Sequence, residues 1–100
     1  QEIVEGAGYS VVKSLVGHGV GKDLHEEPEV PGYLAVKLEK TPKLTEGMTI
    51  AVEVIYNMGK DEVMYKEDDG WTISTGDGSL SGLFERTIAI TQNGPVILTK

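Results

Sequence analysis

The chain has 100 residues, of which 16 are acidic and 9 basic, and its formal net charge is −7 at neutral pH. This length suits one domain with a single core, so we expect residues 1–100 to form one domain. The acidic balance argues against nucleic acid as a partner, because phosphate binding needs clustered Lys and Arg. The chain has no cysteine, which excludes disulfides and thiolate metal sites and fits a cytoplasmic location. No apolar stretch approaches the ~20 residues of a membrane span, so we expect no membrane partner.

The first predicted elements are short. Residues 1–8 are typical of the end of an amphipathic helix, with glycines as its stop signal. The apolar, β-branched stretch 9–16 favours a strand, and the glycine-rich stretch 17–28 favours a loop. Residues 34–39 are interpreted as a short half-buried strand or an extended segment.

Strand signals dominate the second part of the chain. The strongest strand covers residues 48–57, where successive side chains alternate between two faces. Residues 62–65 and 71–75 flank an Asp-Gly turn and predict a hairpin. Residues 83–91 and 95–99 predict two further strands. The pattern as a whole indicates an α+β fold that is mostly an antiparallel, curved sheet with little helix.

Both histidines of the chain lie in the glycine-rich stretch G-H-G-V-G-K-D-L-H-E-E-P. His18 sits between Gly17 and Gly19, and glycine allows close backbone approach and positive φ. His25 follows in the same stretch. The spacing alone leaves two alternatives open: hydrogen-bonded imidazoles in a surface turn, or a metal or catalytic site.

Two glutamates interrupt strands that are otherwise largely apolar: Glu53 lies within 48–57 and Glu85 within 83–91. An ionised carboxylate among apolar neighbours is costly unless it is paired, hydrogen-bonded or bound to a cation, although a wet strand face would also accommodate it. Together with His18, these carboxylates favour a cation site. Imidazole and carboxylates suit Mn, Fe, Co or Zn better than Ca. No phosphate-loop or nucleophile-elbow motif competes with this interpretation.

The motifs around these residues resemble the type I methionine aminopeptidases, which are metallopeptidases of the pita-bread fold. The similarity rests on G-H-G-V-G followed by H-E-E-P, on D-G-W-T and on S-G-L-F-E-R-T, in the family's order. It covers nearly the whole chain and corresponds to the C-terminal half of the family's catalytic domain. The resemblance therefore implies half of a pita-bread fold.

The resemblance also implies residue roles. His18, Glu53 and Glu85 would be ligands of a pair of divalent metal ions, with Glu53 also handling protons and Glu85 bridging the metals. His25 would contact the scissile peptide and, with Glu53, take part in catalysis. The remaining implied positions are Leu24 and Trp71 in the methionine pocket and Ser81 near a monovalent-cation site.

The implied activity is removal of the N-terminal methionine from a peptide or nascent protein by a metal-activated water. Two departures bear on this activity: Val54 replaces the proline that usually follows Glu53, and the family's two aspartate ligands belong to the N-terminal half and have no match here. Three hypotheses follow. The chain is part of an aminopeptidase that needs a missing N-terminal half, a self-assembling half that pairs with a second copy, or a non-catalytic module that binds peptide or protein N-termini.

Overall fold

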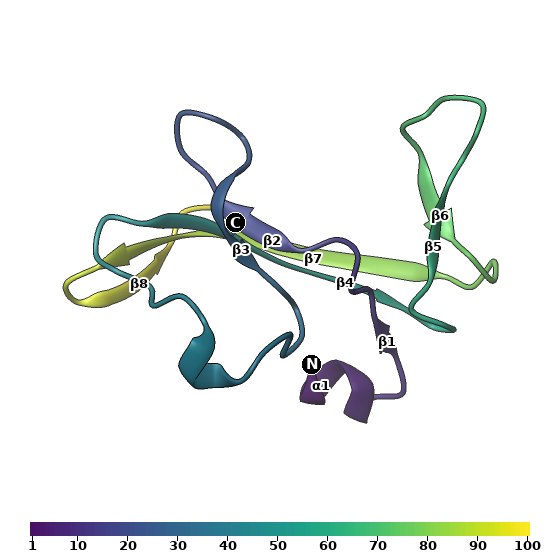
Figure 1. The fold of residues 1–100 in the computed structure, drawn as a ribbon, viewed down its shortest axis with the longest axis horizontal. Coiled ribbons are helices and arrows are strands. Elements are labelled where there is room, and N and C mark those ends of the chain that lie inside the picture. The colour runs from purple at the N-terminus through teal and green to yellow at the C-terminus, as the bar shows by residue number, and fades with distance from the viewer.

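A computed structural model describes residues 1–100. The chain begins with one short helix, α1 (Glu2–Gly6), and has a single 3-10 turn, η1 (Leu38–Lys40); the rest is strands and connecting segments (Figure 1). The strands are β1 (Ser10–Val11), β2 (Gly17–Gly19), β3 (Glu26–Val30), β4 (Thr49–Asn57), β5 (Val63–Tyr65), β6 (Ile73–Thr75), β7 (Ser81–Thr91) and β8 (Gly94–Ile97).

Six of the strands form the main sheet, in the order β3-β2-β4-β7-β8, with β1 paired to the end of β4. Strands β5 and β6 form a separate two-stranded hairpin. Every strand pair is antiparallel. This architecture confirms the predicted α+β class, a mostly antiparallel sheet with little helix.

The centre of the sheet is the long pairing of β4 with β7. Its register runs without a break from Thr49 opposite Ala89 to Asn57 opposite Ser81. Strand β4 matches the prediction for 48–57 closely, whereas β7 begins two residues before the predicted 83–91. The early start is possible because residue 82 is glycine: a Cβ there would lie 2.8 Å from the ring of Tyr56.

The predicted loop over 17–28 is wrong, because its two ends are strands. The G-H-G segment is β2, which lies between β3 and β4. A Cβ at Gly17 would lie 2.3 Å from the carbonyl oxygen of Ala51, and one at Gly19 would lie 2.1 Å from that of Glu27. Neither glycine has a positive φ. These glycines therefore serve close backbone packing within the sheet rather than a turn.

Two other expectations change at the edges of the sheet. The predicted strand over 9–16 is reduced to the two residues of β1. Residues 34–39 form no strand, and η1 begins within them at Leu38, so neither predicted alternative describes the whole segment. The side chains of Leu34 and Leu38 are 64% and 75% exposed. The alternating pattern of this segment therefore does not produce a strand, because no neighbouring strand is available for pairing.

Exposed hydrogen bonds tie the base of the β5–β6 hairpin. The carboxylate of Asp77 accepts the backbone N–H of Lys60 at 2.8 Å and that of Ser79 at 3.0 Å. The hydroxyl of Ser79 accepts the N–H of Gly59 at 3.1 Å. The Lys60 N–H, followed by Ser79, lowers the pKa of Asp77 to about 2. Asp77 thus links the segment before β5 to the segment after β6.

The core is small for a chain of this length. Only seven residues are buried, and the apolar ones are Val11, Val12, Ile50 and Ala51. The radius of gyration is 14.9 Å, against about 13 Å for a closed 100-residue domain. No helix has the length and hydropathy to cross a membrane. The sheet therefore leaves much of its apolar surface uncovered.

We predict that truncating Ile50, which is 2% exposed, removes a large part of the stability of the sheet. Ile50→Ala should lower the free energy of unfolding by about 2–5 kcal/mol, and Ile50→Val by about 0.5–1.5 kcal/mol, because the cost follows the volume lost. Urea denaturation followed by far-UV circular dichroism measures both. Val96→Ala is the matched control, since Val96 is 48% exposed and should change stability by less than about 0.5 kcal/mol. Equal losses for Ile50→Ala and Val96→Ala would contradict this placement of the core.

Candidate active site

The register of the sheet places the two strand glutamates side by side. Glu53 on β4 and Glu85 on β7 are direct partners across the ladder. Directly opposed residues in an antiparallel pair point to the same face. His18 on β2 lies opposite Ala51, which precedes Glu53 by two residues on β4. All three predicted metal ligands therefore share one face of three adjacent strands.

The two carboxylates differ in their surroundings. Glu53 is half-buried and Glu85 is exposed. Burial raises the pKa of Glu53 above its usual 4.5, the negative charge of Glu85 raises it further, and His18 and His25 act in the opposite direction. The expectation of a carboxylate held among apolar neighbours thus fits Glu53 but not Glu85, because no other part of the chain covers that end of the face. The site carries negative charge that a bound cation would neutralise.

The imidazole of His18 is oriented by its own backbone. Its Nδ1 lies 2.8 Å from the carbonyl oxygen of Gly19. A carbonyl can only accept a hydrogen bond, so Nδ1 carries the proton and donates it. The Nε2 lone pair then remains available, which is the arrangement that metal-binding histidines use.

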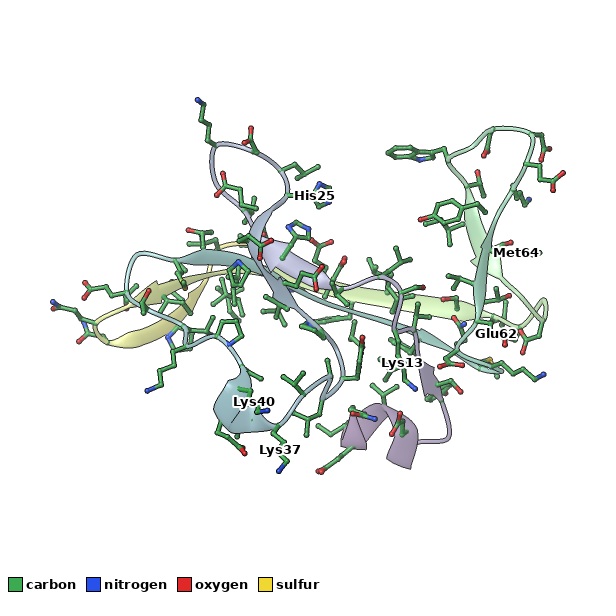
Figure 2. All side chains as sticks on the ribbon, in the orientation of Figure 1. Lys13, His25, Lys37, Lys40, Glu62 and Met64 are labelled. Carbon is green, nitrogen blue, oxygen red and sulfur yellow. The ribbon has the colours of Figure 1, made fainter.

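His25 stands over the same face, on the loop between β2 and β3. Its ring centroid is 4.3 Å from that of His18, with the ring planes at 50°. The loop is stabilised where Glu26 accepts the backbone N–H of Asp23 at 2.9 Å. In Figure 2, His25 lies on the side of the loop that faces the β5–β6 hairpin. The structure thus brings both histidines to the Glu53–Glu85 pair.

The fit of these residues to a metal ion is partial. No group of three or more His, Asp or Glu side chains converges to hold a metal. The chemistry of the donors nevertheless suits a divalent transition metal: His18 offers a free imidazole nitrogen, and Glu53 and Glu85 form a like-charged carboxylate pair. We therefore describe His18, Glu53 and Glu85 as an incomplete ligand set that further ligands would have to close.

The other predicted positions lie on separate elements. Leu24, 71% exposed, precedes His25 in the β2–β3 loop, and Trp71, 86% exposed, lies in the turn of the β5–β6 hairpin. The β2–β3 loop and the β5–β6 hairpin both project from the same side of the sheet (Figure 1). Ser81 lies at the start of β7, opposite Asn57, where its hydroxyl donates to the carbonyl of Tyr56 at 3.3 Å. The structure does not bring Ser81 to the histidines.

Glu29 is a neighbour of the site that was not predicted from the sequence. It is the direct partner of His18 in the β2–β3 ladder. With His18 and His25 it lines one hollow of the surface. The segment E-E-P-E-V gives little sign of a strand, because acids and proline are both rare in sheets. The only sequence signal for the pairing of this segment with the G-H-G strand is the pair of glycines, which allow the two backbones to approach closely.

Comparison with known proteins defines the class to which this fold and site belong. The sequence profile of metallopeptidase family M24 matches residues 1–92, so the chain belongs to that family. A methionine aminopeptidase of Clostridium perfringens is 50% identical over 99 residues, which are 99% of this chain and 39% of that protein. The methionine aminopeptidase of Escherichia coli (strain K12) is 46% identical over 99 residues, which are 99% of this chain and 36% of that protein.

Solved structures show the same relationship. The methionine aminopeptidase of Thermotoga maritima superposes with a TM-score of 0.91 at 48% identity, covering 100% of this chain and 39% of the other. That of Rickettsia prowazekii gives a TM-score of 0.91 at 38% identity and covers 100% and 40%, respectively. The predicted resemblance and the predicted partial pita-bread fold are confirmed. The chain spans about two-fifths of the length of the relatives it matches.

We predict that Glu85→Gln lowers the pKa of Glu53 in the metal-free chain, because it removes the neighbouring negative charge. Burial, the larger cause of the rise, remains in the variant, so only the part of the rise that Glu85 contributes should be lost. Carbon-detected NMR titration of the carboxyl groups measures the change, and Glu46→Gln, at an exposed position in the segment before β4, is the control.

The same shift has a consequence for stability. A raised pKa means that the favourable contribution of protonated Glu53 is present below pH 4.5 and is lost as the pH rises through the raised value. As the pH rises through this range, the metal-free Glu85→Gln chain should therefore lose less stability than the metal-free wild-type chain. A Glu53 pKa that is the same in wild type and Glu85→Gln would contradict the pairing of the two carboxylates.

Proposed function

We propose that this chain carries part of the active site of a metal-dependent aminopeptidase that removes N-terminal methionine from peptides and nascent proteins. The observation that carries the proposal is the Glu53–Glu85 pair with His18 on the adjacent strand, all on one face. Membership of metallopeptidase family M24 and the similarity to methionine aminopeptidases support it. We also propose a cytoplasmic location, which the cysteine-free composition supports.

In this proposal the incomplete ligand set holds divalent metal. His18 would bind through Nε2, and Glu53 and Glu85 would bind through their carboxylates, with Mn, Fe, Co or Zn as the candidate ions and two ions in the complete site. When bound, such metals supply Lewis acidity, which lowers the pKa of water and polarises a carbonyl. The raised pKa of Glu53 supports this role, because the carboxylate pair gains most when a cation offsets its charge.

The proton steps fall to this chain's own residues. Glu53 is half-buried beside Glu85, and its carboxylate would accept a proton from the attacking water and later donate it to the leaving amine. His25 would donate a hydrogen bond to the scissile peptide group, where negative charge develops. Its ring lies 4.3 Å from that of His18, so a peptide group that binds His25 would lie beside the imidazole that we propose as a metal ligand.

The methionine side chain would be bound between the β2–β3 loop and the β5–β6 hairpin. Leu24 lies beside His25 in the β2–β3 loop, and Trp71 lies in the turn of the hairpin. Aliphatic and aromatic walls suit a thioether, since sulfur–aromatic contacts are favourable. Ser81 lies further along β7, and there we propose a monovalent-cation ligand.

The remaining ligands would come from chain that this sequence does not contain. The incomplete ligand set and the relatives' greater length both support a partner half. A second copy of this chain is another candidate, favoured by exposed apolar residues on the same face as Glu85, such as Leu83, which is 56% exposed, and Val96, which is 48% exposed. The failure of three ligands to converge favours a further candidate, a non-catalytic module that binds peptide or protein N-termini.

We predict that Glu85→Gln weakens binding of Mn²⁺ or Co²⁺ by this chain by about tenfold or more, because it removes a ligand charge from a partly desolvated site. Isothermal titration calorimetry with each metal measures the affinity, and Glu46→Gln is again the control. Unchanged affinity in Glu85→Gln would exclude Glu85 as a ligand.

We expect cleavage of a methionyl-alanine peptide to require metal and a partner for the incomplete ligand set. The assay measures free methionine released by this chain alone, and by this chain mixed with the N-terminal portion of a relative. Sedimentation velocity at micromolar concentration shows whether two copies associate. A monomer would exclude the second copy, and a chelator-insensitive peptide affinity without cleavage would support the non-catalytic module.

A further inference from the structure

The turn that carries Trp71 is built around a single carboxylate. It closes the β5–β6 hairpin, where the N–H of Lys66 donates to the carbonyl of Thr72 at 2.9 Å. Gly70 has a φ of 62°, a left-handed conformation that glycine adopts without strain. The chain therefore turns sharply at Gly70 and presents Trp71 directly afterwards.

Asp69 binds the backbone on both sides of the Trp71 side chain. One carboxylate oxygen, Oδ1, accepts the N–H of Trp71 at 2.9 Å and the N–H of Thr72 at 2.8 Å. The other oxygen, Oδ2, accepts the hydroxyl of Thr72. The Thr72 hydroxyl and these two N–H groups lower the pKa of Asp69. Three donors from two consecutive residues thus converge on one side chain.

No packing holds the indole of Trp71 in place. Its side chain is 86% exposed, and the hollow beside it is lined only by residues of the same hairpin, including Tyr65 and Ile73. The backbone at residue 71 therefore sets where the indole is attached and the direction in which it leaves the turn. Asp69 is the side chain that binds this backbone.

We infer that Asp69 is a positioning residue for Trp71, which it holds ready to contact the substrate's methionine side chain. The substrate part of this inference rests on the proposed function. Asp69 itself does not contact the substrate, because its carboxylate is occupied by Trp71 and Thr72. Its effect is to restrict the motion of the turn that carries the indole before the substrate arrives, which lowers the entropy lost on binding.

Trp71 is the only tryptophan of the chain, so its fluorescence reports on this turn alone. In Asp69→Ala, the fast, subnanosecond part of the fluorescence anisotropy decay should grow about twofold, because an untethered turn moves on that timescale. Asp69→Asn should stay close to wild type, since its amide oxygen still accepts both N–H groups and its NH2 group can donate to the hydroxyl oxygen of Thr72. Asp68→Ala is the matched control and should also leave the decay unchanged.

Far-UV circular dichroism of each variant shows whether the strands are retained. If Asp69→Ala loses them, Thr72→Val becomes the deciding variant, because it removes only the hydroxyl donor; it should increase the fast component with the strands intact. If Asp69→Ala is folded, a fast component at the wild-type level would overturn the inference. If Asp69→Ala is unfolded, the same result in Thr72→Val would overturn it.

Binding of a methionyl-alanine peptide, followed by quenching of the same fluorescence, separates this inference from the proposed function. The peptide should bind Asp69→Ala about tenfold more weakly than wild type, and Asp69→Asn with wild-type affinity. If the wild-type chain binds no peptide, the proposed function fails for the isolated chain, while the anisotropy result still decides whether Asp69 positions Trp71. Equal affinities in Asp69→Ala and wild type would remove Asp69 from substrate binding.

Discussion

The constraint on which the site depends is the unbroken register between β4 and β7. Because Thr49 pairs with Ala89 and Asn57 with Ser81, Glu53 must face Glu85. A shift of one residue would turn one carboxylate to the opposite face of the sheet. This register places two like charges next to each other, which contributes to the raised pKa of Glu53. It also places both carboxylates on the same face as His18. Stability and site chemistry oppose each other at this ladder, which is common at functional sites.

The rest of the structure is open. A sheet of this kind normally packs an apolar face against another layer, yet Val52, Phe84 and Ile97 are between 38% and 64% exposed. The short α1 covers only one end of that face (Figure 1). By the register of β4, β7 and β8, this apolar face is opposite to the one that carries Glu53 and Glu85. The sheet is therefore open on both sides: one face exposes apolar side chains, and the other exposes Glu85.

Much of this could be predicted from residue patterns, and the exceptions share a cause. The alternation in β4 and β7 placed Glu53 and Glu85 correctly on strands, because that signal is local. The β2 and β3 strands were missed because their pairing depends on backbone approach at Gly17 and Gly19, which no periodicity records. His25 lies close to His18 because it is in the loop that connects these two paired strands. The strand positions of Glu53 and Glu85 could therefore be predicted from local alternation, but the placement of His18 and His25 beside each other could not, because it depends on the β2–β3 pairing.

The tie at the base of the hairpin has a consequence for acid solutions. Asp77, with its pKa of about 2, contributes stability above the ordinary aspartate range and loses it only as the pH falls toward that value. The base of the hairpin should therefore stay tied when other carboxylates of the chain have become neutral. Acid would protonate Glu53, whose pKa is raised, while the hydrogen bonds of Asp77 at the base of the hairpin persist. Loss of charge and loss of shape at this face would then be separate events that a pH titration can resolve.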